Sequence, residues 1–392
     1  MKLAIVTNIL TPYRVPLFDA LAKRVDDLTV LLMARHEENR QWEIGAVPFK
    51  TKVLKGFHLK PPGADVSLHW NYGVVAALRA MDPDIVLSGG FAPANLAAYL
   101  YCRWFAKAYV GWGEFTLRDN ARSSPVRRWL RRRLTSGSAA SIASSTEARQ
   151  AFMHYGAPPH RILTSLMPID VERLRGEVCA FRATPAYADL RRSFPSPCIL
   201  SVGRLTDRKG FRDLLAMYEI VVRQMPDVSL LLVGDGPDRP AYESFARERG
   251  LRQVHFAGFV SPAQLPRYLA LADLFVFPTR SDTYGAALAE AMAAEIPVVS
   301  SIFAAATADL VVYGVNGYSM IPTVHDSAAE RIIDLLRLPP ADRRAMGEAA
   351  YRSVKQSDIA CSADAMVRFL ETVVPAARHA PLAPSASQPV LK

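Results

Sequence analysis

The stretch CILSVGRLTDRKGF, residues 198–211, carries the pattern that decides the fold. An apolar run ends at Gly203 and Arg204, a polar loop follows, and a helical pattern begins at Lys209 and Gly210. A strand that leads through a loop into a helix is the repeating unit of a parallel sheet. The start of such a helix favours a bound anion, because its N–H groups and dipole point there. Arg204 and Lys209 are therefore candidates for holding a diphosphate.

A second cluster, SDTYGAALAEAMAAEIPVV at 281–299, follows the apolar run LFVFPT. Gly285 stands where the next helix begins, so the backbone there can approach a ligand closely and offers a second anion site. Glu290 lies about one and a half turns further along the helix, among apolar residues. A carboxylate in this place can accept hydrogen bonds from both hydroxyls of a ribose. The alternative for Glu290, as for Lys209, is an ordinary solvated position.

The same alternation of apolar runs and helical periodicity continues on both sides of these clusters. In the first half, the sequence predicts strands at 2–8, 28–34, 84–90 and 107–113 and helices near 69–81, 94–105 and 122–134. In the second half, it predicts strands at 198–204, 227–236, 254–260, 274–279 and 296–301 and helices at 210–224, 239–249, 262–271 and 285–294. Two successive units of this kind predict an α/β protein with two Rossmann-like domains that face one cleft.

The domain limits follow from where the pattern changes. We predict an N-terminal domain over 1–175, a linker over 176–197 where prolines interrupt the pattern, and a C-terminal domain over 198–357. A last periodic helix, from Asp358 to Val374, is assigned to 358–375, and the proline-rich segment 376–392 is expected to be a disordered tail.

Composition excludes several classes of protein. With 392 residues, 50% of them hydrophobic, the chain can form sizeable cores, so most of it is not intrinsically disordered. Its four cysteines lie far apart and form no C-x-x-C pair, which argues against a disulfide framework and a zinc site. The first residues lack a signal-peptide pattern. The uncharged run 85–102 contains two glycines and a proline, and is interpreted as strand, turn and helix rather than a membrane span.

The net charge of +10 is confined to the first half of the chain. Residues 1–175 carry 24 Lys and Arg against 14 Asp and Glu, whereas residues 176–392 carry 23 of each. Six arginines crowd the segment 122–134, at positions Arg122, Arg127, Arg128, Arg131, Arg132 and Arg133. Val126, Trp129, Leu130 and Leu134 recur at helical spacing, so the segment predicts an amphipathic helix for an anionic membrane surface. The alternatives are a helix that packs its apolar side on the sheet and, with less support, a nucleic-acid site.

Taken in order, these motifs resemble a known family. VGR-x4-KG, LLVGDGPDR, FAGFV and D-x-Y-G-x4-E-A-M-A, over 198–301, are similar to the C-terminal domain of retaining, GT-B-fold glycosyltransferases of group 1 (family 4 type). The opening TPYRVPLFDAL resembles the start of bacterial members, so the likeness covers residues 1 to about 375. The resemblance implies a nucleotide-sugar donor, retention of anomeric configuration and no cofactor.

The resemblance also implies roles for individual residues. Arg204 and Lys209 match the pair that holds the donor diphosphate, and Asp282 and Glu290 match the two acids of an E-x7-E pattern. Residues matching the donor-binding main chain and helix start are Gly203, Val260, Tyr284, Gly285, Ala286 and Ala287. Asp282 is one methylene shorter than the usual glutamate. Glu114 stands where relatives often have histidine, so it either binds acceptor or sugar hydroxyls or is a buried acid paired with Arg118.

The sequence therefore predicts a glycosyltransferase that uses a nucleotide sugar, without a metal, to build bacterial cell-surface polysaccharide or glycolipid. We expect a glycan or lipid-linked acceptor, a cytoplasmic location against the inner membrane face, and no nucleic-acid partner. Rival interpretations are a sugar-nucleotide epimerase, a sugar-phosphate synthase, or a glycan-binding scaffold with weak activity. The determinants of donor and acceptor are expected in the loops after the N-terminal strands, including 11–14 and 89–95.

Overall fold

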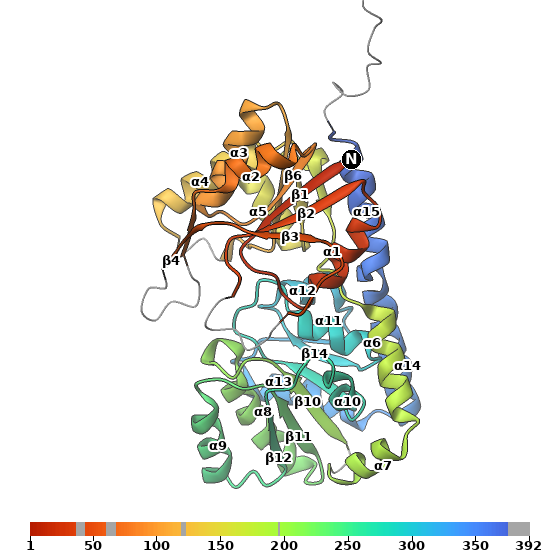
Figure 1. Cartoon of the computed structure of the whole chain (residues 1–392). Coiled ribbons are helices and arrows are strands. Elements are labelled where there is room, and N and C mark those ends of the chain that lie inside the picture. Colours follow the sequence, from red (N-terminus) through yellow and green to blue (C-terminus); the bar gives the residue numbers. More distant parts are fainter. Residues whose placement is uncertain (37–43, 60–67, 119–122, 195–196, 375–392) are drawn as a thin grey trace, which may run out of the picture.

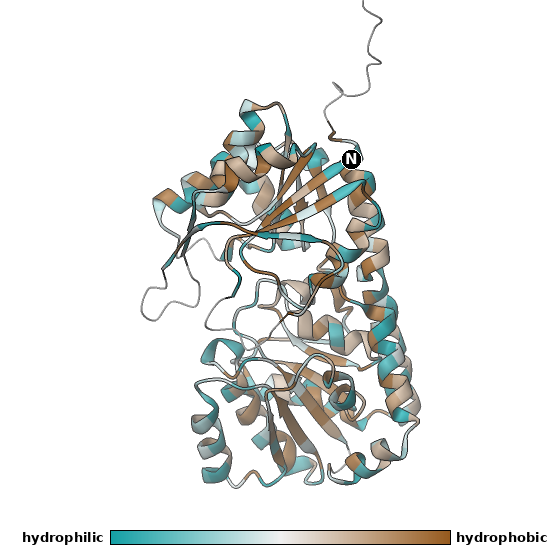
Figure 2. Cartoon of the chain, viewed as in Figure 1, coloured by the Kyte–Doolittle hydropathy of each residue, from teal (hydrophilic) through white to brown (hydrophobic). Residues whose placement is uncertain are grey.

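The computed structural model describes residues 1–36, 44–59, 68–118, 123–194 and 197–374. The chain forms two α/β domains, one above the other in Figure 1, each built on a parallel sheet. Figure 2 shows that the strands of both sheets are largely hydrophobic, whereas the outer helices mix hydrophobic and hydrophilic residues. Strands covered on both faces require such continuous apolar runs. The predicted α/β class with two Rossmann-like domains is confirmed.

The N-terminal sheet has the strand order β3-β2-β1-β6-β7-β8-β9. Its strands are β1 (Lys2–Thr7), β2 (Asp27–Leu32), β3 (Lys50–Val53), β6 (Ile85–Gly89), β7 (Ala108–Gly113), β8 (Ala140–Ala143) and β9 (Ile162–Thr164). The helices around it are α1 (Val15–Ala22), α2 (Val74–Met81), α3 (Pro93–Trp104), α4 (Pro125–Ser136) and α5 (Thr146–His154). A separate antiparallel pair joins β4 (Gly56–Leu59) to β5 (Leu68–Asn71), so the helix predicted near 69–81 begins only at Val74.

The C-terminal sheet has the strand order β12-β11-β10-β13-β14-β15. Its strands are β10 (Cys198–Val202), β11 (Ser229–Val233), β12 (Val254–Gly258), β13 (Leu274–Phe277), β14 (Val298–Ser301) and β15 (Gly317–Met320). Its helices include α8 (Phe211–Gln224), α9 (Arg239–Glu248), α10 (Leu265–Leu269), α11 (Ala286–Ala293), α12 (Ala305–Leu310), α13 (His325–Arg337) and α14 (Pro340–Val354). The predicted strands of this half are all present.

The chain crosses between the domains twice, at one place. Ile169, in the first crossing segment, forms an isolated β-bridge with Asp358 in the second. The Ile169 N–H donates to the Ser357 carbonyl at 3.0 Å. After the second crossing, α15 (Ile359–Glu371) returns to the N-terminal domain along the right edge of Figure 1, where Met366 and Leu370 join the core of that domain. The predicted final helix is therefore present, three residues shorter at its C-terminal end.

The segment 176–197, predicted as a linker, is helical in its described part. It holds the end of α6 (Val171–Arg182) and all of α7 (Pro185–Arg192), and Val178 lies in the C-terminal core. The prolines were interpreted as a break in the helical pattern. Pro185, however, occupies the first turn of α7, where a backbone N–H has no helical hydrogen-bond partner and its absence does not destabilise the helix. The expected disordered tail at 376–392 lies outside the described residues.

The arginine-rich helix α4 only partly matches its predicted amphipathic pattern. Leu134 is buried, but Val126 and Trp129 are 74% and 59% exposed and do not pack on the sheet. Arg131 is buried, and its guanidinium lies over the rings of Phe91 and Phe115. The exposed face therefore combines apolar side chains with Arg127, Arg128, Arg132 and Arg133, whereas Arg131 is removed from the predicted basic face and Arg122 lies outside the described residues.

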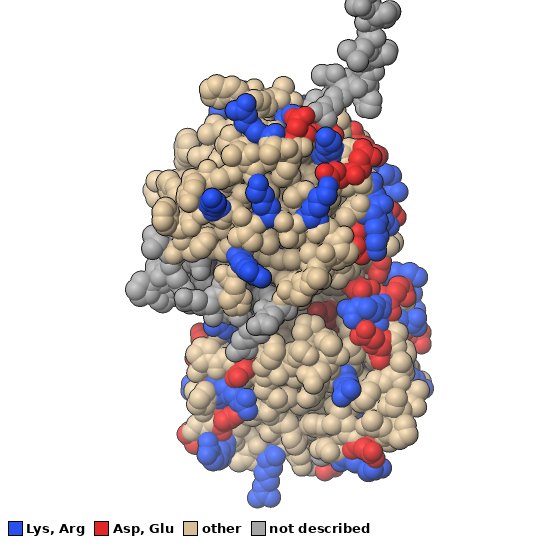
Figure 3. All heavy atoms as spheres, in the orientation of Figure 1, with Lys and Arg blue, Asp and Glu red and all other residues tan. Residues whose placement is uncertain are grey.

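Charge is distributed unequally between the domains, as the sequence indicates. Figure 3 shows single basic side chains spread over the upper domain, and basic and acidic side chains side by side along the edge formed by α14 and α15. In the described ranges, no helix is both long and apolar enough to cross a membrane. The uncharged run 85–102 consists of β6, a turn and most of α3, which confirms its interpretation as strand, turn and helix.

Candidate active site

A cavity of about 410 Å³ lies between the two domains. The N-terminal domain contributes Tyr13 and Glu114, and Met167 lies at the crossing between domains. The C-terminal domain contributes Val202, Gly203, Arg204, Thr206, Arg208, Lys209, Phe277, Asp282, Thr283, Tyr284, Gly285, Ala286 and Ala287. We call this space the interdomain cavity. It brings together eight of the predicted site residues with Glu114 from the opposite domain.

The position of the interdomain cavity follows from the sheet topology. In the C-terminal sheet the strand order reverses direction between β10 and β13, which pair in parallel. Gly203 directly follows β10, and Asp282 lies in the loop after β13. Ligands of open α/β sheets bind at the carboxyl ends of the strands, next to such a reversal. The two motif clusters of the sequence therefore meet at the place where this fold binds ligands.

The loop after β10 is held closely against its neighbours. The Gly203 N–H donates to the Val233 carbonyl, and a Cβ at Gly234 would lie 1.9 Å from the Gly203 oxygen. Residues 207–209 form a single 3-10 turn, and Gly210 follows with a φ of +71°. A Cβ on Gly210 would come within 2.0 Å of the Pro278 carbonyl oxygen. Glycine is thus required at 210 both by the left-handed backbone and by the close approach.

Lys209 lies at the end of that 3-10 turn, not in the first turn of α8 as the sequence indicated. Its ammonium forms an ion pair with Asp282, and both side chains are largely buried, at 17% and 14% exposed. The ammonium also lies 5.8 Å from the centre of the Phe277 ring. A lysine ammonium has three N–H donors, so it can keep Asp282 and still donate to an anion in the interdomain cavity. Arg204 is exposed at the rim of the same cavity.

A network around Arg280 fixes the two loops relative to one another. Arg280 donates to both oxygens of the buried Asp213, at 2.7 and 2.9 Å, and to Asp207 of the 3-10 turn. His325 approaches the same carboxylate of Asp213 at 3.0 Å. Burial alone would raise the pKa of Asp213, but the hydrogen bonds from Arg280 and His325 lower it below its usual value. Asp213 therefore stays ionised and anchors the loop that carries Asp282.

Sequence reasoning missed this network, although one signal was available. Arg280 comes three residues after the buried strand β13, at the carboxyl end where site residues gather. A charged residue in that place is a candidate for binding or positioning. Its partner Asp213 is 67 positions earlier, inside a helix, and no local pattern joins the two.

The first turn of α11 presents its backbone to the interdomain cavity. Gly285 precedes it with a φ of +108°, and a Cβ there would lie 2.8 Å from a carbon of the Phe277 ring. Ala286 and Ala287 follow, with side chains too small to cover the N–H groups at the helix start. These N–H groups and the helix dipole favour an anion. Tyr284 is 1% exposed, and burial raises the pKa of its hydroxyl well above the usual range.

Glu290 and Val260, both predicted to bind the donor, do not line the interdomain cavity. Glu290 lies on α11 and is half-buried among apolar residues, which raises the pKa of its carboxyl to about 7 although Arg173 opposes this rise. Val260 is half-buried after β12 and packs against the C-terminal core. If these two residues contact the nucleoside of the donor as predicted, the nucleoside lies beside the interdomain cavity and not within it.

The N-terminal wall of the interdomain cavity centres on an ion pair that the sequence did not predict. Glu114 accepts from Arg14 at 2.8 Å, and Arg14 also donates to Thr7 at 2.9 Å. The guanidinium lies 4.6 Å from the centre of the Trp112 ring. Burial alone would lower the pKa of Arg14, but Tyr13 and Glu114 raise it, so the side chain stays charged. The loop 11–14, expected to hold acceptor determinants, thus supplies the partner of Glu114.

The alternative that Glu114 is paired with Arg118 is wrong. Arg118 points to Glu147 and donates to the Ile302 carbonyl of the C-terminal domain at 3.1 Å. The N–H of Thr146 donates to Asp309 across the same boundary at 3.1 Å. Arg118 therefore contacts both domains, whereas the side chain of Glu114 lines the interdomain cavity.

The described parts of the chain show no candidate metal centre. No group of three or more His, Cys, Asp or Glu side chains there is arranged to hold a metal ion. The four cysteines form no disulfide. The prediction that transfer needs no metal remains a prediction.

Comparison with known proteins was made for sequence and for structure. Residues 190–353 match the model of the family described as glycosyl transferases group 1. A GDP-mannose-dependent alpha-(1-6)-phosphatidylinositol monomannoside mannosyltransferase from Mycobacterium tuberculosis is 28% identical over 69% of this chain and 68% of its own length. An alpha-D-kanosaminyltransferase from Streptomyces kanamyceticus is 26% identical over 45% of this chain, which spans 46% of that relative.

Solved structures extend the likeness to nearly the whole chain. The crystal structure of Anabaena Alr3699/HepE in complex with UDP superposes with a TM-score of 0.73 at 18% identity, over 95% of this chain and all of that one. A sucrose-phosphate synthase from Thermosynechococcus elongatus gives the same TM-score at 17% identity, over 95% of this chain and 99% of that one. At these identities the likeness establishes the GT-B fold. The family match over residues 190–353, together with the glycosyltransferase relatives, supports a glycosyltransferase of the group 1 type.

Proposed function

We propose that this chain transfers a sugar from a nucleoside-diphosphate sugar to an acceptor hydroxyl, with retention of anomeric configuration. The observation that carries the proposal is the convergence of Lys209, Arg204 and the first turn of α11 on one interdomain cavity, opposite Glu114. Two cations and a helix start on one wall suit a diphosphate. A carboxylate on the other wall suits a hydroxyl. The UDP complex of the structural neighbour HepE supports this choice of donor.

The chemistry places the largest charge change at the phosphates. The bond between the anomeric carbon and the diphosphate oxygen breaks, and negative charge develops on the leaving nucleoside diphosphate. Lys209, Arg204 and the N–H groups of Ala286 and Ala287 lie in fixed positions to stabilise that charge. The acceptor oxygen attacks from the same face, and its proton passes to the leaving phosphate. Closure of the two domains excludes water, which would otherwise hydrolyse the donor.

The other predicted residues complete the donor site in this proposal. Gly203 and Tyr284 shape the wall beside the phosphates, and Asp282 keeps Lys209 in place while facing the sugar. Glu290 accepts from the ribose hydroxyls, and the main chain at Val260 faces the base. No cofactor is required, because the two cations take the role that a metal ion has in other transferases.

A donor screen by thermal shift tests this proposal. UDP-, GDP- and ADP-sugars are added to the full chain, and a tightly bound donor raises the melting temperature by mass action. We expect one nucleotide class to stabilise the protein, and the same donor to lose its effect on a Lys209→Ala variant. Absence of any shift with all three classes, confirmed by calorimetry, would reject the proposal and favour a glycan-binding scaffold.

We further propose that the acceptor is a glycan or a lipid-linked glycan in cell-surface synthesis, presented at an anionic membrane. A lipopolysaccharide core biosynthesis glycosyltransferase from Rhizobium meliloti, which is 34% identical over 27% of this chain, supports this choice of acceptor. On α4, the exposed Trp129 and Val126 stand among four exposed arginines. A tryptophan beside arginines suits the boundary between headgroups and acyl chains.

Liposome sedimentation tests the membrane part separately. Replacing the four exposed arginines of α4 (Arg127, Arg128, Arg132 and Arg133) by serine is expected to reduce binding to vesicles that contain anionic lipid. Each arginine near such a surface contributes about 1 kcal/mol, so the four together should abolish sedimentation at low micromolar lipid. Unchanged sedimentation of the variant would reject the membrane contact without affecting the donor site.

A further inference from the structure

A second cavity, of about 350 Å³, lies at the opposite end of the C-terminal sheet. It is bounded by Asp273, which directly precedes β13, and by Pro297, which directly precedes β14. These are the amino ends of the strands, whereas the interdomain cavity lies at their carboxyl ends. We call this space the arginine cavity. The four residues of β13 separate it from the loop that carries Asp282, so the two cavities are distinct.

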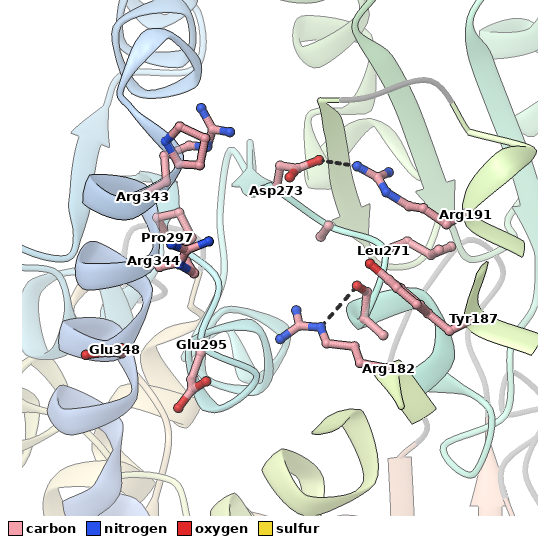
Figure 4. A pocket seen from close by; sticks show the side chains of 13 residues that line it. Arg182, Tyr187, Arg191, Leu271, Asp273, Glu295, Pro297, Arg343, Arg344 and Glu348 are labelled. Atoms are coloured by element: carbon pink, nitrogen blue, oxygen red, sulfur yellow. Dashed lines mark hydrogen bonds and ion pairs between the residues drawn. The ribbon is translucent and has the colours of Figure 1, made fainter. Parts of the chain in front are cut away.

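Four arginines from three helices line the arginine cavity. Arg182 ends α6, Arg191 lies on α7, and Arg343 and Arg344 lie in the first turns of α14. Figure 4 shows Arg343 and Arg344 on one wall and Arg182 and Arg191 on the other, with open space between them. Guanidinium groups that converge from opposite walls repel one another unless an anion lies between them.

The acids of the arginine cavity neutralise only one of these four arginines. Asp273 is paired with Arg191 at 2.7 Å. Glu295 is paired with Arg175 at 2.7 Å, and Glu348 lies 3.9 Å from Arg352, and neither of these two arginines lines the cavity. Six arginines therefore surround three carboxylates.

The other three lining arginines contact uncharged carbonyl groups or are exposed. Arg182 donates to the Ala270 carbonyl at 3.3 Å, and Arg343 donates to the carbonyls of Leu336 and Leu338 at 2.7 and 2.6 Å. A carbonyl orients a guanidinium without cancelling its charge. Arg344 is exposed at the rim. Three of the four lining arginines, Arg182, Arg343 and Arg344, thus have no ion pair within the described residues. Asp342, in the first turn of α14, offsets the positive end of that helix dipole.

We infer that the arginine cavity binds a small phosphorylated molecule, separate from the sugar donor. Phosphate oxygens match the forked donors of arginine, which bind them in pairs. The volume lies within the range of small-molecule sites, about 300–1,000 Å³. Tyr187 and Pro340 give the cavity apolar surface beside the arginines, on which the carbon skeleton of a sugar phosphate can pack. Free phosphate and a sugar phosphate share the recognised group.

Calorimetric titration of the full chain at constant ionic strength tests this inference. Inorganic phosphate and glucose 6-phosphate are titrated into the unchanged protein and into Arg344→Glu, Arg182→Gln and Lys209→Ala variants. Arg344 has an exposed side chain, so its replacement leaves the fold intact. Arg247→Gln, an exposed arginine on α9, is the matched control. We expect saturable binding that weakens about tenfold in each cavity variant, as loss of one charge-assisted contact implies, and is unchanged in the control.

The Lys209→Ala arm separates this site from the donor site. Binding that persists in Lys209→Ala supports the arginine cavity, whereas binding that is lost there and kept in Arg344→Glu places all phosphate in the interdomain cavity and overturns the inference. No saturable binding of either probe to any protein also overturns it. If glucose 6-phosphate binds more tightly than inorganic phosphate, the apolar wall contacts the sugar of a sugar phosphate. If the two probes bind equally, the site is one for free phosphate.

Discussion

The two walls of the interdomain cavity are built in different ways. The C-terminal wall, which we call the backbone wall, consists of two loops and a helix start, placed by Gly210 and Gly285 and tied together through Arg280 and Asp213. It also carries the side chains of Lys209 and Asp282. The N-terminal wall is made of side chains, with Glu114 held by Arg14 over the ring of Trp112. The backbone of such a wall can change little without rebuilding the fold, and in the proposed function it faces the diphosphate that every nucleotide sugar shares.

Side chains on the N-terminal wall can be exchanged without rebuilding the fold. Glu114 and Tyr13 stand in loops after β7 and β1, and such loops carry most of the functional variation of α/β proteins. Under the proposed function, donor recognition depends on the architecture of the fold, whereas acceptor recognition depends on a few replaceable side chains. Three of the four measurements below test this division between the two walls, and the fourth concerns Glu290 beside the cavity.

The largest effect is expected for Lys209→Ala. This change removes the one ammonium of the backbone wall and should lower donor turnover by about 100- to 1,000-fold, as loss of a fixed group facing developing charge does. Turnover is followed as release of nucleoside diphosphate. Arg247→Gln serves as control, because it removes an exposed cation on α9, away from the interdomain cavity. Turnover at the unmodified level in a folded Lys209→Ala protein would contradict the assignment of this wall to the phosphates.

Gly210→Ala tests whether the backbone wall is as rigid as its contacts imply. The left-handed φ and the clash with the Pro278 oxygen together should lower the free energy of unfolding by about 2–4 kcal/mol. Gly250→Ala is the matched control, since Gly250 has a φ of +65° but no atom within 4 Å of a Cβ. It should cost only about 1 kcal/mol. Equal losses in urea denaturation would show that the close approach at Pro278 does not matter.

Glu290 predicts a pH dependence of stability. Its pKa of about 7 in the folded protein lies above the ordinary 4.5, so the folded state binds the proton more tightly. Relative to Glu290→Gln, the protein should therefore lose stability as the pH rises from 4.5 to 7, by about 1.4 kcal/mol per pH unit at most. Melting temperatures of both proteins across this range measure the difference. A constant difference would mean that the carboxyl is not in an apolar setting.

The smallest effect is expected for Glu114→Gln. The amide keeps the shape but accepts more weakly, so the acceptor KM should rise about tenfold while binding of the nucleoside diphosphate stays unchanged. Glu147→Gln, another carboxylate paired with an arginine in the same domain, is the control. If Glu114→Gln weakened nucleotide binding instead, the division of labour between the walls would be wrong.

The sequence predicts the C-terminal wall well because its residues lie in continuous motifs. Strands and helix starts are local patterns, so the cluster 198–211 and the cluster 281–299 could each be placed at the carboxyl end of a strand. Once two strands are neighbours in one parallel sheet, the residues after them must meet. For this reason Lys209 and Asp282, 73 positions apart, could be assigned to one site.

The N-terminal wall could be predicted only in part. Glu114 was singled out because it stands where relatives often have histidine, but its partner Arg14 lies 100 positions away, in a loop whose conformation no periodic pattern specifies. The nearer Arg118 was an obvious candidate, yet its guanidinium pairs with Glu147 and donates to the Ile302 carbonyl of the other domain. Likewise, the outward direction of Trp129 depends on how α4 is rotated against the sheet, which helical spacing alone does not determine.

Titration calorimetry with the nucleoside diphosphate selected by the donor screen tests the central claim most directly. It is carried out on the unchanged chain, on Lys209→Ala and on Glu114→Gln. We predict one binding site per chain, weakened at least about tenfold by Lys209→Ala and unaffected by Glu114→Gln. Equal affinity of the unchanged chain and Lys209→Ala, with both proteins folded, would contradict the claim that the backbone wall of the interdomain cavity holds the donor.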